Sequence, residues 1–222
     1  MIGRAIFNQT PLPPNRLAPL PLGAVRPEGW LLEQLTMQAE ALKGGVLKDF
    51  PAAFSDDPWL GGKGDDLERA PRLLDGLIHL AYTLQDETLK AASDRFVEAA
   101  LSSQTSTGAF GPGEDGNWWP RMLMLRPLRA YFTATGDKRA LLLMDRFFKY
   151  QLRALESDPL TEYAAARSKE NMAAALWLYN LTGQKHLLTL CDKLRSQSLD
   201  WTNSLHIFPY IRPMARMRPW ME

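Results

Sequence analysis

Acidic side chains cluster in two stretches of the sequence that also contain glycine. Hydrolysis of a glycosidic bond commonly uses two carboxyl groups, one that donates a proton and one that acts as base or nucleophile. Acidic residues in loops are more often simply solvated, so these clusters supply candidates and not an assignment. The candidate catalytic residues are Asp65, Asp66, Glu68, Glu114 and Asp115.

Aromatic residues next to polar ones form a second set of candidates. Trp118 and Trp119 are adjacent and follow Asn117. Indole rings can stack on a sugar while amide and guanidinium groups bind its hydroxyls. The alternative is that both tryptophans fill the space between helices. The predicted substrate-binding residues are Trp59, Arg72, Asn117, Trp118, Trp119 and Arg121.

Residues for other kinds of chemistry lack the required spacing. The 3 histidines have no metal-ligand spacing, and the single cysteine, Cys191, excludes an internal disulfide and a cysteine metal cluster. The segment 61–64, Gly-Gly-Lys-Gly, lacks the spacing of a phosphate-binding loop. We therefore expect no metal and no cofactor. Asp75 and His79 are four residues apart, and we interpret them as a buried pair in which each side chain satisfies the other.

The elements that must position these side chains form a repeat. Tyr82, Tyr131 and Tyr179 recur at intervals of 49 and 48 residues, each just before a turn. This period lies in the range of two-helix repeat units. In each unit an apolar helix ends near a turn residue such as Gly136 or Gly183, and an amphipathic helix follows. The sequence therefore predicts an all-α fold of repeated helical hairpins, in which apolar inner helices are wrapped by amphipathic outer ones.

Long connections precede the predicted inner helices. They cover residues 46–70, 106–119 and 155–167. Each runs from the end of an outer helix to the start of an inner one, so we expect all of them at one end of the array. Long ordered loops on a repeat scaffold commonly carry function, so this end is the predicted mouth of a site.

Each predicted inner helix begins with a cation in its first turn. These cations are Arg72, Arg121 and Lys169. A positive charge there opposes the helix dipole. Each cation is therefore expected to pair with an acid of a neighbouring loop or to help bind a polar or anionic ligand.

The overall composition is that of one soluble helical domain. The chain has 222 residues, of which 45% are hydrophobic and 23% are charged. Its net charge of +1 gives no electrostatic case for binding nucleic acid or an anionic membrane. The N-terminus lacks an apolar signal core and no apolar run could span a bilayer, so we expect a cytoplasmic protein. We divide the chain into a proline-rich arm (1–25), a helical-hairpin domain (26–205) and an irregular tail (206–222).

Segments 21–31, 59–71 and 117–122 carry a resemblance to a known family. They include Trp-Leu-Gly-Gly at 59–62 and Asn-Trp-Trp-Pro-Arg-Met at 117–122. The chain resembles the N-terminal part of bacterial proteins related to β-L-arabinofuranosidases, of glycoside hydrolase family 127 and its relatives of unknown function. The resemblance covers residues from about 20 to 201. It implies an (α/α)6 toroid with the sugar bound at the mouth of the inner ring.

The sequence also departs from that family. In characterised members the acid/base glutamate, the cysteine nucleophile and a cysteine-rich zinc site lie further along the chain than this sequence extends, and Cys191 matches none of them. Three hairpins make about half of a six-hairpin ring. We expect a glycoside-hydrolase-like domain that needs a second half to be complete. The alternative is a non-catalytic helical-repeat module that binds a protein or a glycan. Uncovered flanks of a half-ring predict self-association or pairing with a separate second half.

Overall fold

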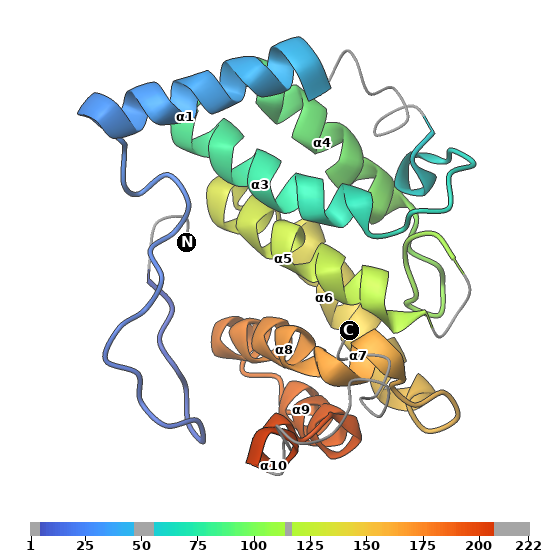
Figure 1. Cartoon of the computed structure of the whole chain (residues 1–222). Helices are drawn as coiled ribbons and strands as arrows, with labels where there is room; N and C mark the ends of the chain where they lie inside the picture. The colour runs from blue at the N-terminus through green and yellow to red at the C-terminus, as the bar shows by residue number, and fades with distance from the viewer. Residues whose placement is uncertain (1–4, 47–55, 114–116, 207–222) are drawn as a thin grey trace.

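The computed structural model describes residues 5–46, 56–113 and 117–206, and every regular element within these ranges is helical. The all-α prediction is confirmed. Three antiparallel hairpins follow one another along the chain (Figure 1). The inner helices are α3 (Arg69–Leu84), α5 (Trp118–Thr135) and α8 (Ser168–Thr182), and the outer helices are α4 (Glu87–Ser102), α6 (Lys138–Ala154) and α9 (His186–Gln197).

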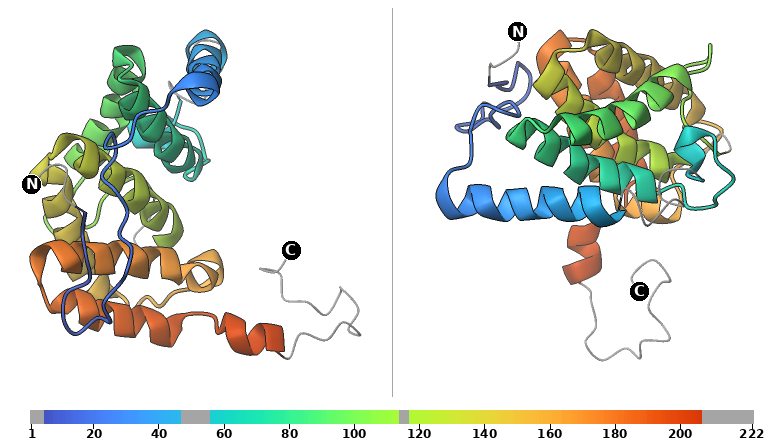
Figure 2. Two further views of the ribbon diagram at one scale, coloured as in Figure 1. Left: turned by 90° about the vertical axis from the view of Figure 1, so that its left-hand side faces the viewer. Right: turned by 90° about the horizontal axis from the view of Figure 1, so that it is seen from above.

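The hairpins form an arc with two layers. In Figure 1 the inner helices α3, α5 and α8 face the viewer, and the outer helices lie behind them. Viewed along the helices, the arc is open on the side of the inner layer (Figure 2, left). The three hairpins are half the number that a closed six-hairpin ring contains.

The turns inside the three hairpins share the same backbone geometry at the end of the inner helix. The residue after each inner helix adopts the left-handed conformation: Gln85 (φ 58°), Gly136 (φ 74°) and Gly183 (φ 69°). Each donates its backbone N–H to a carbonyl in the last turn of the helix, which ends the helix within one residue. The predicted ends at Gly136 and Gly183 are confirmed, and Gln85 replaces the glycine in the first hairpin.

The described parts of the long connections lie at one end of the array, as predicted. In Figure 1 they are on the right, and the short turns are on the left. The connections also hold helices that the sequence pattern did not indicate. These are a 3-10 turn at Pro58–Leu60 and α7 (Glu162–Ala166), and a further short helix, α10 (Trp201–His206), follows the last hairpin.

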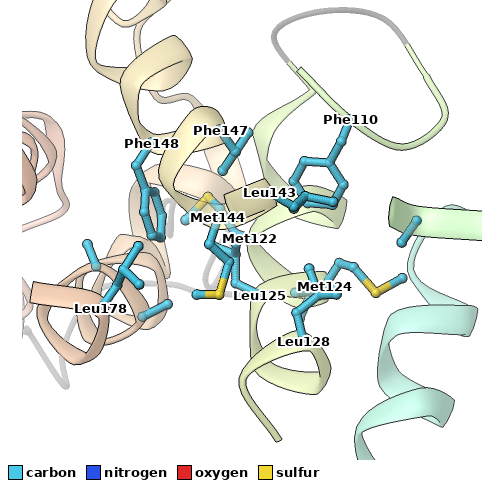
Figure 3. Packing of buried hydrophobic residues seen from close by; sticks show 14 of the residues in the cluster. Phe110, Met122, Met124, Leu125, Leu128, Leu143, Met144, Phe147, Phe148 and Leu178 are labelled. Carbon is cyan, nitrogen blue, oxygen red and sulfur yellow. The ribbon is translucent and has the colours of Figure 1, made fainter. Parts of the chain in front are cut away.

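The larger of two hydrophobic clusters among the described residues lies between the two layers, and a smaller one joins α1, α3 and α4. Met122, Met124, Leu125 and Leu128 of α5 belong to one buried cluster with residues of the outer helix α6 and with Leu178 of α8 (Figure 3). Phe110, from the loop before α5, packs edge-on against Phe147 with ring centroids 5.0 Å apart. The core thus fixes the inner helices by their backs and leaves their fronts on the open side.

Helix α1 (Gly29–Ala41) lies beside α3 and adds little to the core. Only Ala39 of this helix is buried, and Trp30 is 76% exposed. The arm before α1 extends along the end of the array that carries the short turns (Figure 2). There the backbone N–H of Gln9 donates to Asn180 Oδ1 at 3.0 Å, and the Tyr179 hydroxyl donates to the carbonyl of Thr10. Residues 207–222, most of the predicted tail, lie outside the described residues.

None of the helices in the described ranges is both long enough and apolar enough to cross a membrane.

The first hairpin turn provides a test of helix capping. Asp86 accepts the backbone N–H of Leu89 at 3.1 Å and pairs with Lys43 Nζ at 2.8 Å. We expect Asp86→Ala to lower the free energy of unfolding by about 1 kcal/mol, the usual cost of a lost helix cap. Asp86→Asn keeps the cap acceptor and should cost less than half as much. Urea unfolding at neutral pH measures both.

The same residue predicts a pH dependence. Its hydrogen bond with Lys43 lowers the pKa of Asp86 below the usual value. The stabilisation by the charged carboxylate is therefore present above the unfolded-state pKa of about 4 and is lost as the pH falls through the lower folded-state pKa. The stability difference between the wild type and Asp86→Asn should shrink in acid. A difference that is constant down to the acid transition would contradict this.

Candidate functional site

Two of the predicted sugar-stacking residues lie in the hydrophobic core. Trp118 is only 2% exposed, packs against Phe147 and Tyr150, and donates its indole N–H to the carbonyl of Asp158 at 3.1 Å. Trp59 is also buried and donates its indole N–H to the carbonyl of Leu67 at 2.9 Å. In this structure both indoles fill space and hold loops, and for Trp118 this is the alternative that the sequence left open.

Arg121 is buried beneath the loop that precedes α5. Its guanidinium donates to the carbonyls of Phe110 at 2.7 Å, Asn117 at 2.8 Å and Gly113 at 3.2 Å. These contacts tie the carbonyls of the loop and of the first residue before the helix to one side chain of the first turn of α5. The cation in the first turn of α5 therefore has a structural use, whereas Asn117 itself is exposed.

The cations at the start of the other inner helices are exposed. Arg72 pairs with Glu68 one turn away, with Nη2 and Oε2 2.6 Å apart. Lys169 is exposed on α8. The expected pairing with a loop acid thus holds for Arg72.

Two of the described acidic candidates, Asp66 and Glu68, form hydrogen bonds and an ion pair at the start of α3. Asp66 accepts the backbone N–H groups of Glu68 and Arg69, both at 3.0 Å, and Glu68 holds Arg72. Asp65 is exposed. Glu114 and Asp115 lie outside the described residues.

Trp119 is the centre of a cluster at the mouth, together with Tyr163, Arg72 and Arg167. We call these four residues the Trp119 cluster. The rings of Trp119 and Tyr163 are stacked, with centroids 6.4 Å apart and planes at 22°. The guanidinium carbons of Arg72 and Arg167 lie 5.9 and 5.8 Å from the Trp119 centroid, a geometry suited to cation–π attraction. The cluster joins α3, α5 and α7 at the end where the inner helices begin.

A chain of ion pairs crosses the inner layer further from the mouth. Arg126 of α5 places Nη2 2.9 Å from Asp75 Oδ2 of α3 and Nη1 3.6 Å from Glu170 Oε2 of α8. We call Asp75, Arg126 and Glu170 the Arg126 cluster. Sequence reasoning missed it because Arg126 and Glu170 are separated by 44 positions and by two turns of the chain.

The Arg126 cluster faces the open side of the arc. Helices α3 and α8 flank α5, and α6 covers its back, so a side chain of α5 reaches water only on the open side. Within α5, all of which is described, Arg126 is the only exposed residue, and its side chain is 52% accessible. Arg129 lies one turn further along and is partly buried. Burial and the nearby Arg126 lower the pKa of Arg129.

The interpretation of Asp75 and His79 as a closed, buried pair was wrong. His79 is exposed, and its Nδ1 lies 2.6 Å from the backbone carbonyl oxygen of Asp75 but 3.9 Å from the nearest carboxylate oxygen. The Asp75 carboxylate instead pairs with Arg126 on the next helix. The interhelical partner could not be read from a spacing within one helix.

The chemistry of the Arg126 cluster suits a neutral polyhydroxylated ligand. Two carboxylates and the guanidinium groups of Arg126 and Arg129 bring acceptors and donors together on one face with balanced charge. The Oε2 atom of Glu170 is buried and has no hydrogen-bond partner among the described residues. Carboxylates accept from hydroxyls and guanidinium groups donate to them, so alternating groups of this kind can bind neighbouring hydroxyls.

Cys191, unlike the residues of the two clusters, is buried away from the open face as a free thiol. Its Sγ donates toward the carbonyl of Met172 at 3.8 Å, and burial raises the pKa of this thiol to about 12. Only the thiolate is a nucleophile or a metal ligand, so Cys191 has a packing role at neutral pH. Within the described ranges, no group of three or more histidine, cysteine or acidic residues is arranged to hold a metal ion.

Comparison with known proteins gave one finding. A family model described as the β-L-arabinofuranosidase, GH127 catalytic domain, matches residues 64–206. The matched segment contains all three hairpins, the Trp119 cluster and the Arg126 cluster. No curated protein and no solved structure matches the chain.

Arg121 provides a test of the loop before α5. We expect Arg121→Met to lower the free energy of unfolding by about 2–3 kcal/mol, because several buried carbonyls lose a charged donor. Arg121→Lys should restore little, since a single ammonium group cannot reach carbonyls spread over the loop. Urea unfolding measures the loss. A cost below 0.5 kcal/mol for Arg121→Met, the usual range for a surface substitution, would contradict this role.

Proposed function

Because the chain belongs to the family of the β-L-arabinofuranosidase GH127 catalytic domain, we propose that it is a carbohydrate-active, glycoside-hydrolase-like protein whose sugar binds at the Arg126 cluster. The observation that carries this proposal is the position of Arg126. It is the only exposed residue of the most buried helix, and it joins carboxylates from both neighbouring inner helices on the open face.

The contacts of the cluster specify how a sugar would be held. Arg126 has N–H groups beyond those that point at Asp75 and Glu170, and they can donate to hydroxyl oxygens. The two carboxylates lie on opposite sides of Arg126 and can accept from hydroxyls of the same ring. His79, exposed one turn along α3 from Asp75, adds a further polar group on this face. Binding at this place uses the open side of the arc and not its packed core.

In this proposal the chain supplies part of an active site and is not a complete catalyst. Three hairpins form half of a six-hairpin ring, so the described residues supply one wall of the site. Asp65, Asp66 and Glu68, before α3, stay candidates for proton transfer, as do Glu114 and Asp115, which lie outside the described residues. The remaining wall would come from a second half.

A non-catalytic helical-repeat module that binds a glycan is the second candidate function. The burial of Cys191 favours it, because the only thiol of the chain is held in packing and its raised pKa keeps it protonated. Such a module would use the same open face, so binding without turnover is its expected behaviour.

The proposed site can be tested with two matched arginines. Arg126 and Arg139 are both half exposed and both bind two carboxylates, but Arg139 lies on the outer helix α6. We expect Arg126→Met to weaken binding of β-L-arabinofuranosides about tenfold or more, the effect of a lost charge-assisted hydrogen bond. Arg139→Met should leave binding unchanged. Calorimetric or NMR titration measures both. Equal affinities of the two variants would refute the assignment.

We also propose that the chain associates with a second copy through helix α1. Trp30 and Met37 are exposed on this helix, 76% and 60%, and such apolar side chains favour association. Sedimentation at increasing concentration should show a dimer, and Trp30→Glu should reduce it. Leu142 is 57% exposed on the outer helix α6. Leu142→Glu is therefore the matched control and should leave the dimer unchanged. A monomer at all concentrations would contradict the proposal.

A further inference from the structure

We infer that Tyr163 forms a second sugar subsite at the mouth, which takes the unit adjacent to the one held by the Arg126 cluster. This inference rests on the proposed function and adds to it a preference for oligosaccharides over single sugars. Sequence reasoning placed the stacking residues at Trp118 and Trp119 and did not consider Tyr163.

The exposure of the two stacked rings identifies which one a ligand can reach. Trp119 is 6% exposed, whereas Tyr163 is 48% exposed. Trp119 therefore supports Tyr163 from beneath, and Tyr163 presents aromatic surface to solvent. Sugars stack on such surfaces through their C–H groups, as other apolar ligands do on aromatic walls.

Two guanidinium groups border this aromatic surface. Arg72 and Arg167 both lie within 6 Å of the Trp119 ring, and both are exposed. Their positions limit the freedom of the Trp119 ring and bring N–H donors to the ring on which Tyr163 stacks. An aromatic face with flanking donors fits a sugar ring, whose faces are apolar and whose edge carries hydroxyls.

Helix geometry places this subsite next to the Arg126 cluster. Arg72 and Asp75 are three residues apart on α3, and Trp119 and Arg126 are seven apart on α5, so each pair shares one helix face. A rise of about 1.5 Å per residue separates the two levels by roughly 4.5–10 Å along the helices. That separation is comparable to the length of a sugar residue. A terminal unit at Arg126 therefore directs the next unit toward Tyr163.

The backbone before Tyr163 is held in an uncommon conformation. Glu162 has φ 44°, although it is not glycine, and it follows the extended residue Thr161. Such a conformation costs of order 1 kcal/mol and persists only where the surroundings enforce it. The turn is closed by the N–H of Arg167, which donates to the carbonyl of Tyr163 at 2.9 Å. The result is a short, fixed helix that holds Tyr163 stacked on Trp119.

The test compares β-L-arabinofuranose ligands of one, two and three units in titrations with the whole chain. Wild type should bind the two-unit ligand about five- to tenfold more tightly than the one-unit ligand, as expected for one added stacking contact. Tyr163→Ala should remove this gain and leave affinity for the single unit unchanged. Tyr163→Phe should retain it. Phe7→Ala, which removes an exposed aromatic side chain from the arm before α1, is the control and should retain it as well.

The outcomes separate this inference from the proposed function. Loss of binding to every ligand in Arg126→Met, with an unchanged length dependence in Tyr163→Ala, would overturn the subsite and leave the Arg126 site in place. Loss of the gain in Tyr163→Ala, with normal binding by Arg126→Met, would support the subsite and overturn the Arg126 site. Wild-type affinity that does not rise from one unit to two, or no binding of any ligand, would overturn the subsite.

Discussion

The burial of helix α5 is the interaction on which the rest of the structure depends. It lies between α3 and α8 and in front of α6, and its sequence Trp-Trp-Pro-Arg-Met-Leu-Met-Leu is buried without interruption. Burying apolar side chains on three sides supplies the main stabilisation of such a helix. It also restricts where a polar group can stand. Arg126 reaches water only through the one side left open, and the acids of both neighbouring helices converge on it.

Much of the fold could be predicted from the sequence because it is set by local signals. The tyrosine period and the glycines at 136 and 183 mark the hairpins, and the observed helices begin and end close to the predicted residues. Helix α7 could not be predicted. It has 5 residues and its first residue has a positive φ that glutamate rarely adopts, so neither period nor propensity indicates it.

The candidate site was harder to predict, because its residues meet only through tertiary packing. Adjacent tryptophans suggested a sugar platform, yet Trp118 points into the core and Trp119 supports Tyr163 from a different connection. Arg121 and Arg126 are five residues apart on the same helix, and one clamps a loop while the other faces solvent. Side chains that point in different directions around one helix take different roles, which residue type alone does not reveal.

The contacts of the arm before α1 constrain the order in which parts of the chain can fold. Gln9 and Asn180 form hydrogen bonds across a separation of 171 residues, whereas each hairpin joins neighbouring segments. Local contacts form early and distant ones late, because closing a long loop costs chain entropy. During synthesis the hairpins can therefore pair one after another as they leave the ribosome. The arm is synthesised before the hairpins, but it can form its hydrogen bonds with Asn180 only after α8 has been synthesised. Docking of the arm therefore follows formation of the third hairpin.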